Sequence, residues 1–216
     1  IEDGAFKNCK SLTAFLTSNY KGLKTIGAYA FENCDTLKSP TIPVNVTSIG
    51  EGCFMNCDSL QYVSFYASLS EYPKECFKNC SNLSRTGGTA AAFGALKTIG
   101  ESAYEGCSSL TASASWSIGR YRNLETIGAN AFKGCKKIKH ITVGSNIAKL
   151  GKTIFTKCTK LKGIEFKTGR LTKKSIAAGA FKGVSKKVII KVPKEMKKNY
   201  IKFFRAKGLG KKVKVK

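Results

Sequence analysis

The sequence has few of the residues on which most enzyme sites depend. Its 216 residues include one histidine, one tryptophan, two methionines and four prolines. No nucleophile–base pair can be built by spacing around the single histidine, His140. The sequence also lacks a glycine-rich phosphate loop, paired catalytic carboxylates and the H-E-x-x-H metal motif. We therefore expect a protein that is not an enzyme and that holds no cofactor, with no catalytic or metal-binding residues to assign.

Acidic residues are scarce, above all in the second half of the chain. Residues 1–125 contain 11 Lys+Arg and 11 Asp+Glu. Residues 126–216 contain the other 27 basic residues but only Glu165 and Glu195, so the net charge of +25 belongs to this half. The asymmetry favours an acidic partner or surface. Solvated lysines also keep a repeat protein soluble and its sheet edges unpaired, so both interpretations stay open.

Long apolar runs are absent as well. No stretch of 18 apolar residues occurs, and the sequence therefore predicts no transmembrane segment. No signal peptide precedes Ile1. Because the chain opens inside a repeat, we expect a trimmed or mature segment, and the missing signal says nothing about the compartment.

One repeated pattern accounts for most of the apolar residues. Residues 127–143 read IGANAFKGCKKIKHITV, and the same string recurs along the chain. A cysteine follows the aromatic anchor by three residues in seven of eight copies, and the steps between anchors are 23 to 28 residues. One such coil cannot bury its apolar residues alone, so the period predicts a solenoid of stacked coils. The anchors are Phe6, Phe31, Phe54, Phe77, Tyr104, Phe132, Phe155 and Phe181.

The string I-G-x-x-A-F-x-x-C-x-x-L-x-x-I-x-I resembles the BspA-like subclass of bacterial leucine-rich repeats over residues 1 to about 192. The resemblance implies a right-handed solenoid of the α/β horseshoe class. It would have about eight coils, a parallel sheet on its concave side and an irregular convex side. The resemblance also implies a secreted or cell-surface protein that binds proteins or host surfaces. The family shares no catalytic residues, so none can be carried over to this chain.

The chain changes character after the last repeat. The pattern of residues 186–193 predicts a final strand, and the alternation of lysine and valine in residues 211–216 predicts an edge strand. Between them, one face of a predicted amphipathic helix carries Met196, Tyr200, Phe203 and Phe204, with Gly208 at the C′ position. We therefore predict a leucine-rich repeat solenoid over 1–192 and a basic C-terminal cap over 193–216. A basic helix on a membrane surface is the alternative.

Insertions and outward strand positions give the candidate partner-binding residues. Residues 87–95 and 112–123 lengthen their coils, and such insertions often lie on the binding face of a solenoid. With Val63 and Phe65 facing inward, alternation turns their neighbours toward the concave face. Aromatic and arginine side chains are favoured in binding contacts. Trp116 is equally compatible with covering its own irregular coil. The candidates are Tyr62, Ser64, Tyr66, Arg85, Trp116, Arg120, Tyr121, Arg122, His140 and Thr142.

The nine cysteines have a structural explanation in the repeat. Seven form one column, where a small and weakly polar side chain packs between coils. Cys53 and Cys76 fall in a column that alanine otherwise occupies. With Cys57 and Cys80 they imitate the spacing of a four-thiolate zinc site. They also lie within reach of a disulfide bond, although an odd number of cysteines favours free thiols.

The resemblance implies a non-enzymatic binding or adhesion module of a secreted or cell-surface protein, and the outward strand positions and insertions predict that it recognises a protein partner through the concave face and the insertion loops. The alternative is electrostatic attachment of the basic half to anionic cell-wall polymer, membrane or nucleic acid. Nucleic acid is the least favoured of these, because the lysines are scattered with few interleaved aromatic residues.

Overall fold

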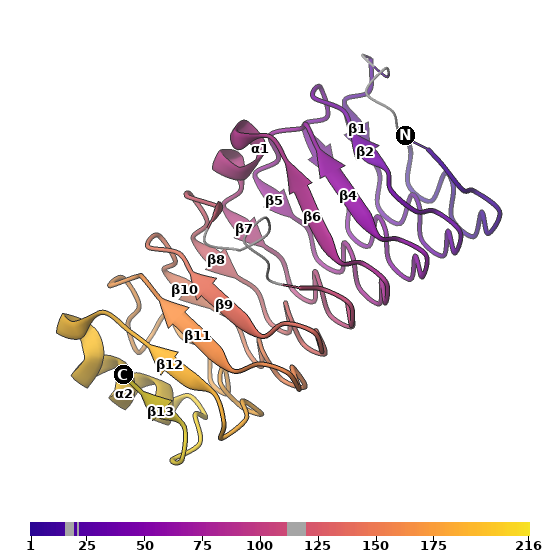
Figure 1. Ribbon diagram of the computed structural model, residues 1–216. Coiled ribbons are helices and arrows are strands. Elements are labelled where there is room, and N and C mark those ends of the chain that lie inside the picture. Colours follow the sequence, from indigo (N-terminus) through magenta and orange to yellow (C-terminus); the bar gives the residue numbers. More distant parts are fainter. Residues whose placement is uncertain (16–19, 21, 112–119) are drawn as a thin grey trace.

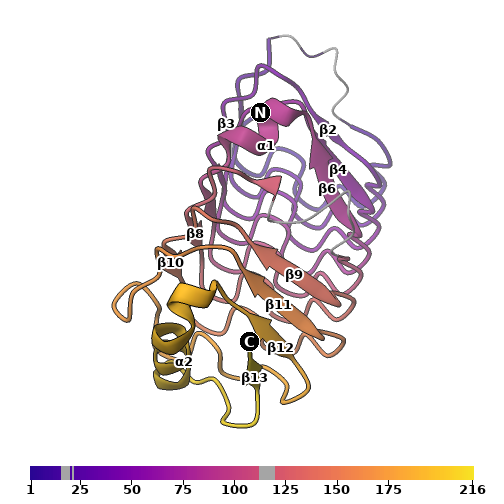
Figure 2. The same ribbon diagram turned by 60° about the vertical axis from the view of Figure 1, so that its left-hand side comes forward.

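The computed structural model describes residues 1–15, 20, 22–111 and 120–216, and it shows an elongated stack of coils (Figure 1). Parallel strands run along two sides of the stack, and the hydrophobic core fills the space between them (Figure 2). Most helix lies in two places, one in an insertion and one at the C-terminal end. The architecture is that of a repeat fold, as the period predicts.

All the strands of three or four residues lie on one side, together with the two-residue strands β2 and β13, and we call this side the long-strand face. Their order is β2-β4-β6 in one sheet and β9-β11-β12-β13 in another, and every pairing is parallel. These strands coincide with the alternating part of the repeat, where β-branched and aromatic residues point inward. The strands are β2 (Thr41–Ile42), β4 (Tyr62–Phe65), β6 (Arg85–Gly88), β9 (His140–Val143), β11 (Gly163–Phe166), β12 (Ile189–Lys191) and β13 (Lys214–Val215).

A second row of two-residue strands lies where the sequence pattern predicted only a turn. Glycine follows five of these six strands, where neighbouring backbones approach closely, and Pro73 follows β5. A Cβ atom on Gly50 would lie 2.2 Å from the backbone nitrogen of Ala28. The orders are β1-β3 and β5-β7-β8-β10. The strands are β1 (Thr25–Ile26), β3 (Ser48–Ile49), β5 (Glu71–Tyr72), β7 (Thr98–Ile99), β8 (Thr126–Ile127) and β10 (Lys149–Leu150).

Two left-handed backbone positions frame each aromatic anchor. One lies two residues before the anchor, as at Gly52 with φ 59°, and the other lies two residues after it, as at Asn56 with φ 58°. Asparagine and glycine tolerate this conformation best. The asparagines also join neighbouring coils, since Asn56 Nδ2 donates to Asn33 Oδ1 at 2.9 Å and Asn79 Nδ2 donates to Asn56 Oδ1 at 2.9 Å.

The core is built from columns that run along the stack. The anchor rings from Phe6 to Phe155 stack in sequence with centroids 5.2 to 6.0 Å apart. Beside them, each buried thiol of the cysteine column donates to the anchor carbonyl of the preceding coil, for example Cys107 Sγ to the Phe77 oxygen at 3.0 Å. The column cysteines are buried between coils, as the sequence predicted, except for Cys9 in the first coil, which is exposed.

The first insertion contains a helix that its glycine and alanine content had not indicated. Helix α1 (Ala90–Ala95) begins after Thr89, whose hydroxyl accepts a hydrogen bond from the Ala92 amide at 3.2 Å. This is a regular N-cap. Part of the second insertion, residues 112–119, lies outside the described residues.

The C-terminal segment packs against the last coils. A 3₁₀ turn, η2 (Lys194–Met196), leads into α2 (Lys197–Ala206), and Gly208 follows with φ 97°. The Leu209 amide donates to the Phe204 carbonyl at 2.9 Å, which completes a Schellman motif. Phe204 contacts Phe181 at 4.4 Å and Phe166 at 5.0 Å between ring centroids. Tyr200 and Phe204 are buried as predicted, whereas Met196 and Phe203 are half-buried.

Candidate functional site

The long-strand face presents the outward side chains that the alternation predicted. Along β4, Val63 and Phe65 are buried, Tyr62 and Ser64 are half-exposed, and Tyr66 follows the strand with 49% of its surface exposed. Tyr62 pairs in register with Arg85 of β6. We call Tyr62, Ser64, Tyr66 and Arg85 the aromatic patch.

Neighbouring groups fix the position of Tyr62. The Arg85 guanidinium carbon lies 4.8 Å from the centroid of the Tyr62 ring, a cation–π contact. The hydroxyl end of the ring lies over β6, where a Cβ atom on Gly87 would come within 2.2 Å of it. Glycine at this strand position therefore makes room for the tyrosine. The aromatic patch thus has a ring whose orientation is set before any partner arrives.

A pocket next to the aromatic patch is formed by the two insertions. Gly88, at the end of β6, lines it together with Phe93, Arg120 and Arg122, and its volume is about 580 Å³. The Arg120 guanidinium carbon lies 5.1 Å from the centroid of the Phe93 ring. The structure therefore brings Arg120 and Arg122 to the end of β6, beside the aromatic patch. Trp116 lies outside the described residues.

Tyr121 is not a contact residue, contrary to the sequence prediction. Only 2% of its surface is exposed, and its ring meets those of Tyr72 and Phe93 edge to face. Its hydroxyl belongs to a buried cluster, 3.5 Å from the hydroxyls of Tyr72 and Thr86. The sequence predicted a contact role for Tyr121 because this residue lies between two arginines in an insertion. The longer coil instead folds this ring into the core.

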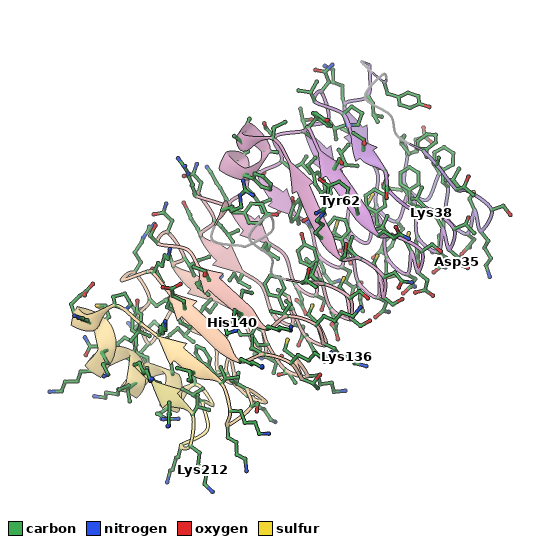
Figure 3. All side chains as sticks on the ribbon, viewed as in Figure 1. Asp35, Lys38, Tyr62, Lys136, His140 and Lys212 are labelled. Carbon is green, nitrogen blue, oxygen red and sulfur yellow. The ribbon has the colours of Figure 1, made fainter. Side chains whose placement is uncertain are left out.

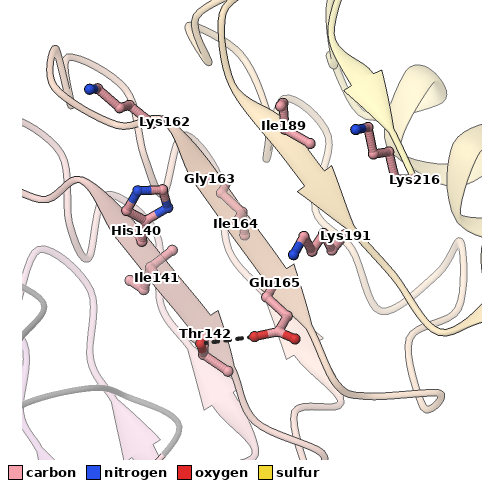
Figure 4. Close-up of a pocket in the computed structure, with 10 residues that line it drawn as sticks. All are labelled: His140, Ile141, Thr142, Lys162, Gly163, Ile164, Glu165, Ile189, Lys191 and Lys216. Atoms are coloured by element: carbon pink, nitrogen blue, oxygen red, sulfur yellow. Dashed lines mark hydrogen bonds between the residues drawn. The ribbon is translucent and has the colours of Figure 1, made fainter. Parts of the chain in front are cut away.

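His140 and Thr142 belong to a second patch on the other long-strand sheet. His140 pairs in register with Gly163 of β11, and Thr142 pairs with Glu165. Thr142 Oγ1 donates to Glu165 Oε2 at 3.3 Å, and Lys191 of β12 lies in register on the other side of Glu165 (Figure 4). We call His140, Thr142, Glu165, Lys191 and Lys216 the basic patch. Lys191 and Lys216 were not among the predicted site residues, although the charge count pointed to this half.

Lysines also line one edge of the stack in the second half. Backbone bonds place equivalent residues of successive coils beside one another, as where the Lys162 amide donates to the Lys139 carbonyl at 2.7 Å. The position after the column cysteine is Asp35 in one early coil and Lys136 in a later one, and both lie on the same edge (Figure 3). The edge therefore changes its charge along the stack. We call it the lysine edge, and the corresponding segments of the later coils contain Lys136, Lys137, Lys139, Lys160, Lys162, Lys186 and Lys187.

Comparison with known families identifies the repeat. The family described as BspA type leucine rich repeat region matches residues 1–111 and 92–209, in six copies. The chain belongs to this family. BspA-type leucine-rich repeats occur on bacterial surface proteins and are typically non-enzymatic. A search of curated proteins finds no match.

Solved structures of bacterial leucine-rich repeat proteins are similar to this chain. A leucine-rich repeat protein from Eubacterium ventriosum ATCC 27560 is 29% identical over 60% of this chain, with a TM-score of 0.50. A leucine rich cell surface protein from Faecalibacterium prausnitzii A2-165 is 28% identical over 73% of this chain, with a TM-score of 0.44. This chain spans 33% of the length of each.

The cysteines of this BspA-type chain are used in packing. All nine, each among the described residues, are free thiols, including Cys53 and Cys76. Burial raises the pKa of the Cys53 and Cys76 thiols well above the ordinary value, which opposes the thiolate form that zinc requires. Within the described residues, no three His, Cys, Asp or Glu side chains are placed to hold a metal ion. The zinc alternative therefore gains no support.

Across the described ranges, none of the helices has both the length and the apolar character needed to cross a bilayer.

Proposed function

We propose that this chain is a binding or adhesion module of a secreted or cell-surface protein, and that it recognises a protein partner through the long-strand face and the adjoining insertions. Membership of the BspA-type family supports the general role. The aromatic patch supports the location, and the single observation that carries it is the fixed Tyr62 ring beside exposed Tyr66 and Arg85. Rigid aromatic and arginine side chains bury large areas at low entropic cost.

We expect the double variant Tyr66→Ala/Arg85→Ala to bind at least about tenfold more weakly to any protein that the unaltered chain captures. Both side chains are exposed, so the variant should keep its melting temperature. Surface plasmon resonance against a panel of purified extracellular proteins measures the loss. Tyr20→Ala is the matched control, because Tyr20 is 45% exposed but belongs to the loop before β1. Equal affinity of all three proteins would show that the partner binds elsewhere.

The alternative function is electrostatic attachment of the basic half to an anionic polymer or membrane. The lysine edge favours it, since stacked coils bring like charges close together unless an anion compensates them. Such binding weakens as the Debye length falls from about 8 Å at 0.15 M salt to about 3 Å at 1 M. Binding that survives 1 M salt and depends on Tyr66 and Arg85 supports the protein-binding role. Binding that vanishes in 1 M salt and is unchanged in the Tyr66→Ala/Arg85→Ala variant supports electrostatic attachment.

We further propose that residues 193–216 form a cap on a 1–192 solenoid. The anchor column supports about eight coils of 23 to 28 residues, and we propose the right-handed winding that the family resemblance implies. The contacts of Phe204 with Phe166 and Phe181 support the cap, because they cover rings that a missing ninth coil would otherwise cover.

A further inference from the structure

A small pocket lies in the middle of the basic patch. Its volume is about 260 Å³, and its lining includes His140, Gly163, Glu165, Ile189 and Lys191. Gly163 is at the start of β11, with His140 on one side of it and Ile189 on the other, both in register. The missing side chain leaves a notch between an imidazole ring and an isoleucine that is 36% exposed (Figure 4).

The notch has apolar walls and a polar end. The His140 ring and Ile189 provide flat or aliphatic surface, and the backbone of Gly163 forms the floor. One row further along the strands, the Glu165 carboxylate accepts from Thr142, and a carboxylate has further lone pairs for a donor from a ligand. A ring that carries one N–H or O–H group fits this combination, with its face on the walls and its donor toward Glu165.

The surroundings of the notch are strongly cationic. Lys162, Lys191 and Lys216 all line the pocket, against the single carboxylate of Glu165. The half of the chain that contains it has 27 basic residues and two acidic ones. A second copy that docks through the same basic half would meet this surface with like charge, which disfavours symmetric self-association here. Charge complementarity therefore favours an acidic occupant.

We propose that the notch over Gly163 is a specificity pocket for a tryptophan or tyrosine side chain within an acidic segment of a protein partner. The ring enters between His140 and Ile189, and acidic residues on either side of it face Lys191, Lys216 and Lys162. This inference rests on the proposed protein-binding function and adds the chemistry of the segment that is bound. The aromatic patch is a separate contact surface on the other sheet.

The variant Gly163→Ala tests the notch without changing any charge. A Cβ atom on Gly163 would lie 2.7 Å from His140 Nδ1, so the methyl group fills the floor and pushes the imidazole aside. An alanine is readily accepted in a strand, and the imidazole is exposed and free to turn. The matched control is Gly22→Ala in the loop before β1, where a Cβ atom also meets nothing within 4 Å. Ile189→Thr is a second variant, which removes one wall and keeps a β-branched residue in β12.

The probes are two capped heptapeptides, Asp-Glu-Asp-Trp-Asp-Glu-Asp and the same sequence with alanine in place of tryptophan. Titration calorimetry with the full chain at 0.15 M salt should give about tenfold tighter binding of the tryptophan peptide. In Gly163→Ala and Ile189→Thr the preference should fall below about threefold, while Gly22→Ala keeps it. Circular dichroism melting checks that all variants are folded.

Four results would overturn the inference. Equal affinity for the two peptides shows that only charge is recognised, and no binding of either excludes an acidic segment altogether. A preference that persists in Gly163→Ala places the ring elsewhere. Oligogalacturonate that binds more tightly than both peptides, and loses affinity in Gly163→Ala, assigns the notch to an anionic sugar. None of these bears on the aromatic patch, so the Tyr66→Ala/Arg85→Ala experiment still decides the proposed function.

Discussion

At the scale of single residues, the cysteine column shows why a thiol suits this repeat. The thiol of one coil donates to the anchor carbonyl of the preceding coil, as with Cys57 and Phe31 at 3.0 Å. The same carbonyl also accepts from the amide of the cysteine in its own coil, here Cys34 at 3.2 Å. The side chain therefore has to be small, apolar enough to bury, and able to donate one weak hydrogen bond.

Substitutions at Cys107 separate packing from hydrogen bonding. We expect Cys107→Ala to lower the free energy of unfolding by about 1–2 kcal/mol, because it removes the donor to Phe77 and leaves a small void. Cys107→Ser should be at least as stable as Cys107→Ala, since its hydroxyl can donate to the same carbonyl. Urea unfolding of both variants measures the difference. If packing alone mattered, serine would be the worse replacement, because it buries a hydroxyl group.

At the scale of elements, the C-terminal helix could be predicted from the sequence together with its end. The spacing of Tyr200 and Phe204 predicted an amphipathic helix, and Gly208 predicted its end. The long strands followed from alternation in the same way. The short strands β1 and β3 were missed because two residues carry no period, and α1 was missed because alanine and glycine have no apolar stripe.

Phe204 and Phe203 are adjacent on α2 but differ in burial, which makes them a matched pair. We expect Phe204→Ala to lower the free energy of unfolding by about 3–5 kcal/mol, because its ring packs on Phe166 and Phe181. Phe203→Ala should cost much less, since Phe203 is only half-buried. Urea unfolding gives both values, and light scattering should show aggregation of Phe204→Ala alone. Similar losses in the two variants would argue against the cap.

The candidate site was predicted less well than the fold, for a physical reason. Alternation decides which strand residues point outward, so the outward direction of Tyr62, Tyr66, Arg85 and His140 was predicted. Insertions have no period, so Tyr121 was placed on the surface although it is buried. The notch over Gly163 could not be found by looking for functional side chains, because its defining feature is an absent one. The notch can be recognised only when the strand register shows that His140 of β9 and Ile189 of β12 lie on either side of Gly163.

At the scale of the whole molecule, the buried columns make stability depend on pH. Burial is the main cause that raises the pKa of Cys34 and of Cys158 to about 12, above the ordinary value of 9.0. A group whose pKa is raised by folding stabilises the fold below its unfolded pKa, and this contribution is lost as the pH rises through the folded value. We therefore expect the free energy of unfolding to fall between about pH 9 and pH 12.

The measurement is urea unfolding at 1 M salt, where repulsion among the many cationic side chains is screened and does not mask the effect of the thiols. A free energy of unfolding that stays constant from pH 9 to pH 12 would contradict the expected role of the buried thiols.

The bonds between coils have a mechanical consequence. The asparagine ladder, the thiol bonds and the strand pairings all join one coil to the next, so they run along the axis of the stack. A pulling force on the two ends loads these interfaces one after another, and the stack should yield by peeling single coils from an end. Each released coil of 23 to 28 residues would add about 8–10 nm of chain. In the proposed adhesion role, the stack would act as an extensible tether that lengthens in steps under load.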